Sequence, residues 1–235
     1  MAIHPFLAMT AEEMRNCPQI PEKIAWMSCH FSSCGRGLTN LPSSLPPDSL
    51  LILDDSTPIC GHDPEWVIEQ LAECISKLEC CGLLLDFQQK PNSESDKFVS
   101  ILTASLPCPV VVSDRYAKNA ACPVFLSPVP PSVALQSHIA PWKGRDIWLE
   151  LALDGELITL TEHGAEAAPL STIHPDKPGF CEDDLHCHYK IDLEENAAHF
   201  TLWRTREDLD ALITEAEALG VSCCIGLYQE LHSFG

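Results

Sequence analysis

The feature that most constrains the fold is a series of short, continuous apolar segments, each followed by polar residues. They cover residues 50–53, 81–87, 109–113 and 123–127. Continuous apolarity over so short a span is typical of strands buried on both faces, as in a parallel sheet. Stretches with helical spacing lie between or after such segments, so the sequence predicts an α/β fold.

Two of the predicted helices have clear ends. Asp63 is suited to cap the first of them, and Pro64 is suited to its first helical position. Thr205 and Asp208 resemble a capping box at the start of the last helix, and Gly220 marks its end. The predicted helices begin at residue 63, cover residues 95–106, and run from residue 205 to Gly220.

The number of strands favours a barrel. Two strand pairs are predicted in a hairpin-rich region, and counting one strand from each pair gives about eight core strands. We therefore predict an irregular TIM-like (β/α)8 barrel, with some outer helices missing and with β-hairpin insertions; a doubly wound open sheet is the alternative. The first strand is expected at 23–30, the pairs at 147–153 with 156–161 and 185–193 with 198–203, and the closing strand at 221–228. The expected organisation is one domain, 1–235, with an N-terminal extension at 1–22 and the hairpin-rich region at 145–204.

The charge of the chain excludes some classes of partner. Lys and Arg number 14 against 34 Asp and Glu, a formal charge of -20. Such a field repels a phosphate backbone and anionic lipid, so we expect neither nucleic acid nor a membrane as a partner. The first residues carry Glu12, Glu13 and Arg15 and lack the pattern of a signal peptide, which predicts a cytoplasmic protein. The 13 cysteines are then expected to be reduced, mostly buried thiols. No oligomeric state is indicated.

Acidic side chains follow several of the predicted strands. In a parallel barrel the carboxyl ends of the strands share one rim, where functional groups lie. Neighbouring carboxylates above an apolar floor would raise one pKa and allow general acid/base chemistry; a solvated acidic rim is the alternative. The candidate catalytic residues are Asp54, Asp86, Asp114 and Glu230, and the candidate substrate-binding residues are Asp55, Gln88, Glu150 and Tyr228.

One strand resembles a known family. Residues 81–88 read Cys-Gly-Leu-Leu-Leu-Asp-Phe-Gln. This segment is similar to the strand motif Asp-Gly-x-Asp-x-Asp-aromatic-Glu of family-18 glycoside hydrolases, the chitinase group. Gly82, Asp86 and Phe87 match the motif, while Cys81 and Leu84 stand at its first two Asp positions. Gln88 stands where the family carries its general acid.

The resemblance implies a divergent, chitinase-like barrel that acts on or binds a small saccharide or glycan fragment. Asp86 matches the family's Asp that orients the acetamido group of the substrate. An amide cannot donate a proton as a carboxylic acid does, so a glycosidase would need another carboxylate as its acid. The alternative is a glycan-binding protein without catalysis.

A metal-dependent hydrolase is a further alternative. His186 and His188 would share one face of a strand, and Cys181 or His174 could complete a zinc site with them. The chain has no Cys-x-x-Cys and no His-Glu-x-x-His, so the primary expectation is no metal. Gly35-Arg-Gly37 lacks the rest of a phosphate-binding loop, and no cofactor is expected.

Overall fold

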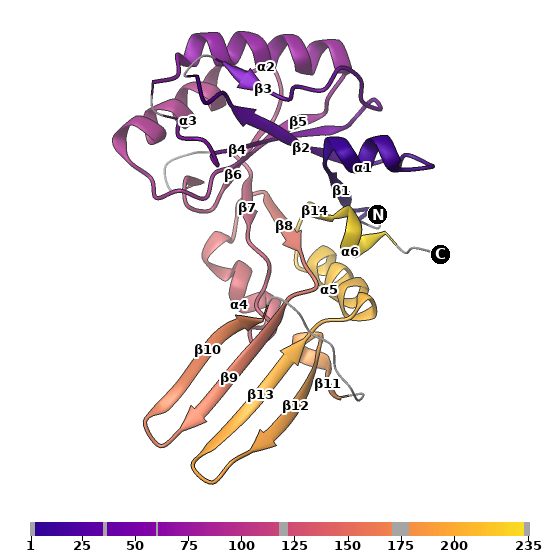
Figure 1. The fold of residues 1–235 in the computed structure, drawn as a ribbon, viewed down its shortest axis with the longest axis vertical. Coiled ribbons are helices and arrows are strands. Elements are labelled where there is room, and N and C mark those ends of the chain that lie inside the picture. Colours follow the sequence, from indigo (N-terminus) through magenta and orange to yellow (C-terminus); the bar gives the residue numbers. More distant parts are fainter. Residues whose placement is uncertain (1–2, 35–36, 60, 118–121, 171–178, 233–235) are drawn as a thin grey trace.

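The main sheet closes on itself as a barrel of eight parallel strands, as a computed structural model shows (Figure 1). The structure describes residues 3–34, 37–59, 61–117, 122–170 and 179–232. The barrel strands are β1 (Phe6–Met9), β2 (Ile24–Phe31), β4 (Leu50–Asp54), β5 (Gly82–Asp86), β6 (Val110–Ser113), β7 (Val124–Leu126), β8 (Ile147–Leu151) and β14 (Cys223–Leu227). β1 pairs with both β14 and β2, which closes the barrel. The predicted TIM-like barrel is confirmed.

Two apolar layers stabilise the barrel, because alternate residues of each strand point inward and outward. The interior layer includes Phe6, Ile52, Leu84, Phe125 and Ile225. The outward residues pack against the helices in a second, larger layer. Each fully buried side chain of this size contributes about 1.5–3 kcal/mol to folding. The sheet is thus apolar on both faces, as the continuous apolar segments predict.

Capping residues fix the ends of the main helices. They are α1 (Ala11–Asn16), α2 (Pro64–Leu78), α3 (Ser93–Ser105), α4 (Leu135–Ile139), α5 (Arg206–Ala218) and α6 (Tyr228–Leu231), with the short 3-10 helices η2 (Ala140–Trp142) and η3 (Asp183–Leu185). The Asp63 side chain accepts a hydrogen bond from the Glu65 amide, and Pro64 is the first residue of α2. Thr205 and Asp208 form the predicted capping box of α5. Gly220, with φ of 87°, follows α5 directly after Leu219.

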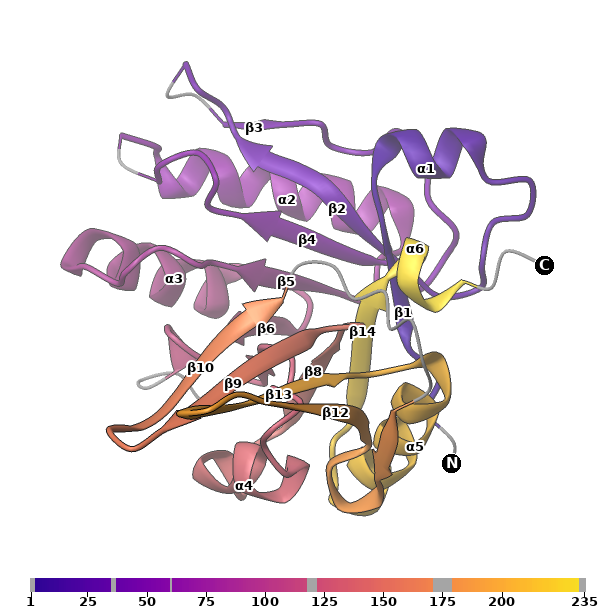
Figure 2. The ribbon, with the colours of Figure 1, turned by 60° about the horizontal axis from the view of Figure 1, so that its bottom comes forward.

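The outer layer of the barrel is irregular. α2 and α3 pack beside each other over the outer side of β4 and β5 (Figure 2). By contrast, α1 has 6 residues and α4 has 5, and the described residues between β6 and β7 form no α-helix. The prediction of a barrel with missing outer helices is confirmed. No helix in the described part of the chain is both long and apolar enough to cross a bilayer.

A second sheet of five antiparallel strands is inserted between β8 and α5. Its order is β10-β9-β13-β12-β11, so the hairpins β9–β10 and β12–β13 lie side by side and extend away from the barrel (Figure 1). The strands are β9 (Gly155–Thr161), β10 (Gly164–Leu170), β11 (Phe180–Glu182), β12 (Cys187–Leu193) and β13 (Ala197–Trp203). Buried Arg204, directly after β13, donates hydrogen bonds to the carbonyls of Val129 and Pro130. These bonds fasten the insertion to the loop that follows β7.

The eight strands of the barrel are not the same eight that the sequence predicts. The first barrel strand is β1, which lies in the expected N-terminal extension; its apolar run of 4 residues is too short to stand out. The predicted hairpin at residues 147–161 is wrong. β8 is a parallel barrel strand between β7 and β14, so both of its edges are occupied and β9 pairs elsewhere.

The hairpin-rich region also differs in detail from the prediction. β10 and β11 lie between the two predicted strand pairs, at residues for which no strand is predicted, and neither strand of the β12–β13 pair joins the barrel. The short strand β3 (Leu38–Thr39), in a segment for which no strand is predicted, pairs antiparallel with β2. His186 lies in the left-handed region with φ of 47° and precedes β12. The prediction that His186 and His188 share one face of a strand is therefore wrong.

Candidate functional site

Three of the predicted acids meet at the carboxyl ends of barrel strands. Asp54 ends β4 and Asp86 ends β5, and the two are direct partners in the parallel register. Both lie on the interior face, because they alternate with Ile52 and Leu84 of the interior layer. Glu150 lies on the same face of β8, two residues after Trp148, which packs against that layer. The mouth of the barrel is thus acidic above an apolar floor.

Glu150 is the most perturbed acid of the mouth. Burial, followed by the negative charges of Asp86, Asp154 and Glu230, raises the pKa of Glu150 from 4.5 to about 7. Below it, the ring of Trp148 stacks on Phe6 inside the barrel. A carboxyl with this pKa holds a proton near neutrality and can still release it, which is the property required of a general acid.

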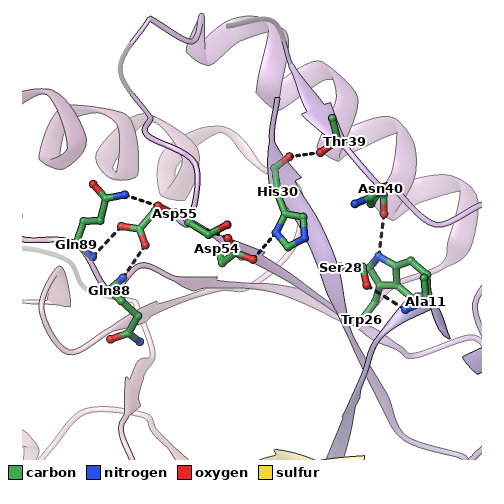
Figure 3. A network of polar contacts seen from close by, with 11 residues as sticks. Ala11, Trp26, Ser28, His30, Thr39, Asn40, Asp54, Asp55, Gln88 and Gln89 are labelled. Carbon is green, nitrogen blue, oxygen red and sulfur yellow. Dashed lines mark hydrogen bonds and ion pairs between the residues drawn. The ribbon is translucent and has the colours of Figure 1, made fainter. Parts of the chain in front are cut away.

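Asp86 interacts with groups from two neighbouring segments. Burial is the largest cause of its raised pKa, and the charges of Asp54 and Asp55 act in the same direction. The amide Nε2 of Gln88 donates a hydrogen bond of 2.5 Å to Asp86 Oδ1, which opposes this shift. Asp54 in turn contacts His30, with Nδ1 and Oδ2 2.5 Å apart (Figure 3). Both carboxylates are therefore held by side chains rather than left to rotate.

Asp55 points away from Asp54 and has a different set of contacts. Asp55 is 3% exposed, and its carboxylate accepts hydrogen bonds from the backbone amides of Gln88 at 2.8 Å and Gln89 at 3.0 Å (Figure 3). The side chain of Gln89 donates to the Asp55 carbonyl. Asp55 thus shapes the loop after β5, and through this loop it positions Gln88 at the rim.

The remaining predicted site residues lie at different places around the rim. Glu230, in α6, accepts a hydrogen bond of 2.9 Å from the Leu153 amide, and its charge contributes to the raised pKa of Glu150. Asp114 follows β6, and its charge acts on His138. Tyr228 is buried against Met9 and Ile24 and lines a pocket of about 840 Å³ between α1 and α6.

Some functional groups of the mouth are not evident from the sequence. His30 lies one residue before the end of β2, and its bond to Asp54 depends on the irregularity between Trp26 and Cys29, where the register with β4 shifts. Asp154 is part of an expected hairpin turn, yet its charge acts on Glu150 across the rim. The proton affinity of Glu150 itself requires burial and neighbours that no local pattern shows.

His186 and His188, which the sequence suggested as zinc ligands, have separate partners. His186 Nε2 lies 2.7 Å from Glu215 Oε2, whereas His188 Nδ1 lies 2.9 Å from Asp208 Oδ2. His174 lies outside the described residues, as do Gly35 and Arg36. The structure therefore does not bring His186 and His188 together as ligands.

A closed parallel barrel with acids at the carboxyl ends of its strands defines a TIM-barrel protein. No protein-family model matches the sequence, and the search of curated proteins found no match either. In its fold the chain is a divergent, chitinase-like TIM barrel, as three groups of solved structures show.

The spore cortex-lytic enzyme SleL of Bacillus cereus is similar at 10% identity, with a TM-score of 0.62, over 95% of this chain and 70% of SleL. A family-18 chitinase variant from Cycas revoluta, in complex with (GlcNAc)4, is similar at 11% identity, with a TM-score of 0.60, over 96% of this chain and 94% of the chitinase. A chitinase from Chromobacterium violaceum has 9% identity and a TM-score of 0.56, over 95% of this chain and 93% of its own.

Proposed function

We propose that the protein hydrolyses a short saccharide containing N-acetylglucosamine at the mouth of the barrel, with Glu150 as the proton donor. The observation that carries this proposal is the Glu150 pKa of about 7, produced by burial and by the charge of Asp86 nearby. Asp86 also stands at the position of the acetamido-orienting Asp in the family-18 strand motif. Two carboxyls thus serve two roles, one protonated and one orienting the substrate.

The reaction follows the substrate-assisted route, the exception to the scheme with two carboxylates. Glu150 gives its proton to the glycosidic oxygen while the bond from that oxygen to the anomeric carbon breaks. The acetamido oxygen of the substrate, oriented by Asp86, bonds to the same carbon. Water then opens the cyclic intermediate and returns a proton to Glu150, so that atoms and charge balance over one turnover.

Gln88 and Asp54 support Asp86 in this proposal. The Gln88 amide donates to Asp86 Oδ1, so it orients the carboxylate and does not replace the missing acid. The charge of Asp54 raises the pKa of Asp86, and His30 fixes Asp54 in place. In the proposed complex the carboxylates of Asp114 and Glu230 line the rim around the sugar.

The proposed class of substrate is supported by the similar structures and by the negative charge of the barrel mouth. The chitinase of Cycas revoluta is seen in complexes with (GlcNAc)3 and (GlcNAc)4. A neutral sugar suits a mouth that would repel anions.

A second candidate is a saccharide-binding protein without catalysis. Gln88, an amide at the position where the family carries its acid, favours this alternative. Asp86 would then bind the acetamido group, and the raised pKa of Glu150 would let a protonated carboxyl donate a hydrogen bond to a sugar oxygen.

The test is incubation of the purified protein with (GlcNAc)4, with shorter products detected by mass spectrometry and binding measured by calorimetry. We expect turnover that falls by about 10²–10⁴-fold in Glu150→Gln, the range for loss of a general acid. Asp86→Ala should remove it as well, while Glu166→Gln, a matched change on exposed β10, should leave it unaltered. Binding without products, weakened by Asp86→Ala, would establish the second candidate; neither binding nor products would refute both.

A further inference from the structure

A second cluster of reactive side chains lies away from the barrel mouth, where the inserted sheet meets α5. Cys181 in β11 and His188 in β12 are direct partners in the antiparallel register. Asp208, the third residue of α5, lies beside them. One ligand atom from each of the three residues lies within 4.8 Å of the other two. Among the described residues no other such group of three or more His, Cys, Asp or Glu occurs.

Two of the three side chains are held in position by their surroundings. Asp208 Oδ2 accepts hydrogen bonds from Thr205, from the backbone amide at 2.7 Å and from Oγ1 at 2.8 Å. The His188 ring stacks on Trp203, with the ring centroids 5.9 Å apart and the planes inclined by 23°. Contacts of this kind orient metal ligands and tune their affinity. Cys181 is exposed, and its thiol donates a long hydrogen bond of 3.5 Å to Asp183 Oδ1, which rotation toward the other two ligands would break.

A neighbouring pair shows what a histidine and an acid do without a third ligand. His186 and Glu215 form a bond of 2.7 Å that joins η3 to α5, and they are not part of the cluster. The pair of His188 and Asp208 forms an equivalent bond of 2.9 Å but adds the thiol of Cys181. Cys181, which lies opposite His188 on the neighbouring strand, therefore distinguishes this cluster from the simple pair of His186 and Glu215.

The chemistry of the three groups selects the ion. A thiolate, an imidazole and a carboxylate together suit Zn²⁺, whereas Ca²⁺ and Mg²⁺ prefer oxygen ligands alone. Tetrahedral zinc with bonds of about 2.0–2.3 Å holds its ligand atoms about 3.6 Å apart. The observed limit of 4.8 Å is within reach of that value by rotation of the Cys181 side chain.

We propose that Cys181, His188 and Asp208 bind a Zn²⁺ ion, with water as the fourth ligand. Binding displaces the thiol proton of Cys181 and the proton shared between His188 and Asp208. The ion joins β11, a strand of 3 residues at the edge of the inserted sheet, to the first turn of α5. It thereby fastens this edge to the barrel. The site is separate from the proposed saccharide site and does not depend on it.

The experiment uses the full chain, freed of metal with a chelator and titrated with Zn²⁺ and, in parallel, with Co²⁺. We expect binding of about one equivalent, an absorption band from thiolate coordination of Co²⁺, and a rise in the melting temperature with Zn²⁺. Cys181→Ser should weaken binding by about tenfold or more and remove the thiolate band. Cys34→Ser, a matched change at another exposed cysteine, should preserve both.

His188→Ala provides a second test, and circular dichroism establishes that each variant is folded. It should weaken Zn²⁺ binding as Cys181→Ser does, whereas Asp86→Ala in the barrel should bind Zn²⁺ like the unaltered chain. The proposal is overturned if the unaltered chain binds no stoichiometric Zn²⁺, or if Cys181→Ser and Cys34→Ser give the same affinity and the same Co²⁺ spectrum.

Discussion

Replacement of Glu150 by Gln should stabilise the protein at alkaline pH and have little effect at acid pH. Glu150 is partly buried beside Asp86, and the charges of Asp154 and Glu230 also act on it. Ionisation of this carboxyl adds a negative charge to a group of like charges above an apolar floor. Gln has nearly the same shape and keeps hydrogen-bonding capacity, but it carries no charge at any pH.

The sign and the size of the effect follow from the pKa of Glu150. This pKa rises from 4.5 to about 7 in the folded protein, so between these values the native state binds more protons than the unfolded chain. The free energy of unfolding then falls as pH rises through this window and levels off above it. At about 1.4 kcal/mol for each pKa unit, the loss reaches at most about 3 kcal/mol by pH 8.

The assay is urea unfolding of both proteins at intervals from pH 4.5 to pH 8.5. The difference in unfolding free energy between Glu150→Gln and the unaltered chain should grow with pH by up to about 3 kcal/mol. Glu166→Gln, at an exposed position of β10, provides the baseline. A difference that stays constant with pH, or that matches this baseline, would refute the burial and charge coupling on which the proposed acid depends.

Three further changes test other parts of the structure. Gln88→Ala removes the amide that donates to Asp86 Oδ1, so the initial rate of (GlcNAc)4 hydrolysis should fall about tenfold or more; an unaltered rate would exclude Gln88 from the orientation of Asp86. Asp55→Ala should lower the free energy of unfolding in urea by about 2–4 kcal/mol, because the amides of Gln88 and Gln89 lose their charged acceptor, while exposed Asp192→Ala should cost about 0.5 kcal/mol or less. Thr205→Ala should cost about 1 kcal/mol in the same assay through loss of the α5 cap; no loss would contradict the capping role.

Local patterns account for the elements that the sequence predicts correctly. The apolar runs that become β4 and β5 are followed directly by acids, and this succession needs no knowledge of the rest of the chain. The caps at Asp63 and Thr205 act within one helical turn, so they can be read from neighbouring residues. A parallel sheet covered on both faces follows from several such strands, whether it is open or closed as a barrel, since strands that are apolar on both faces must be covered on both sides.

Long-range pairing decided what local patterns could not. β1 joins the barrel because it can pair with both β14 and β2. β8 does not form its expected hairpin, because it pairs with barrel strands that include β14. The His30 contact with Asp54 likewise requires a shift of register between β2 and β4. Pairing energy depends on partners far along the chain, which no window of sequence contains.

The sequence by itself determined the kind of fold and the presence of acids at strand ends. Only the tertiary structure decided which acid holds a proton and which side chains could share a metal ion. Glu150 acquires its pKa from burial and from Asp86, Asp154 and Glu230, which lie in other segments. Cys181 meets Asp208 only because β11, β12 and α5 pack together. Proton affinity and metal coordination depend on distance in space, and folding is what brings such distant residues together.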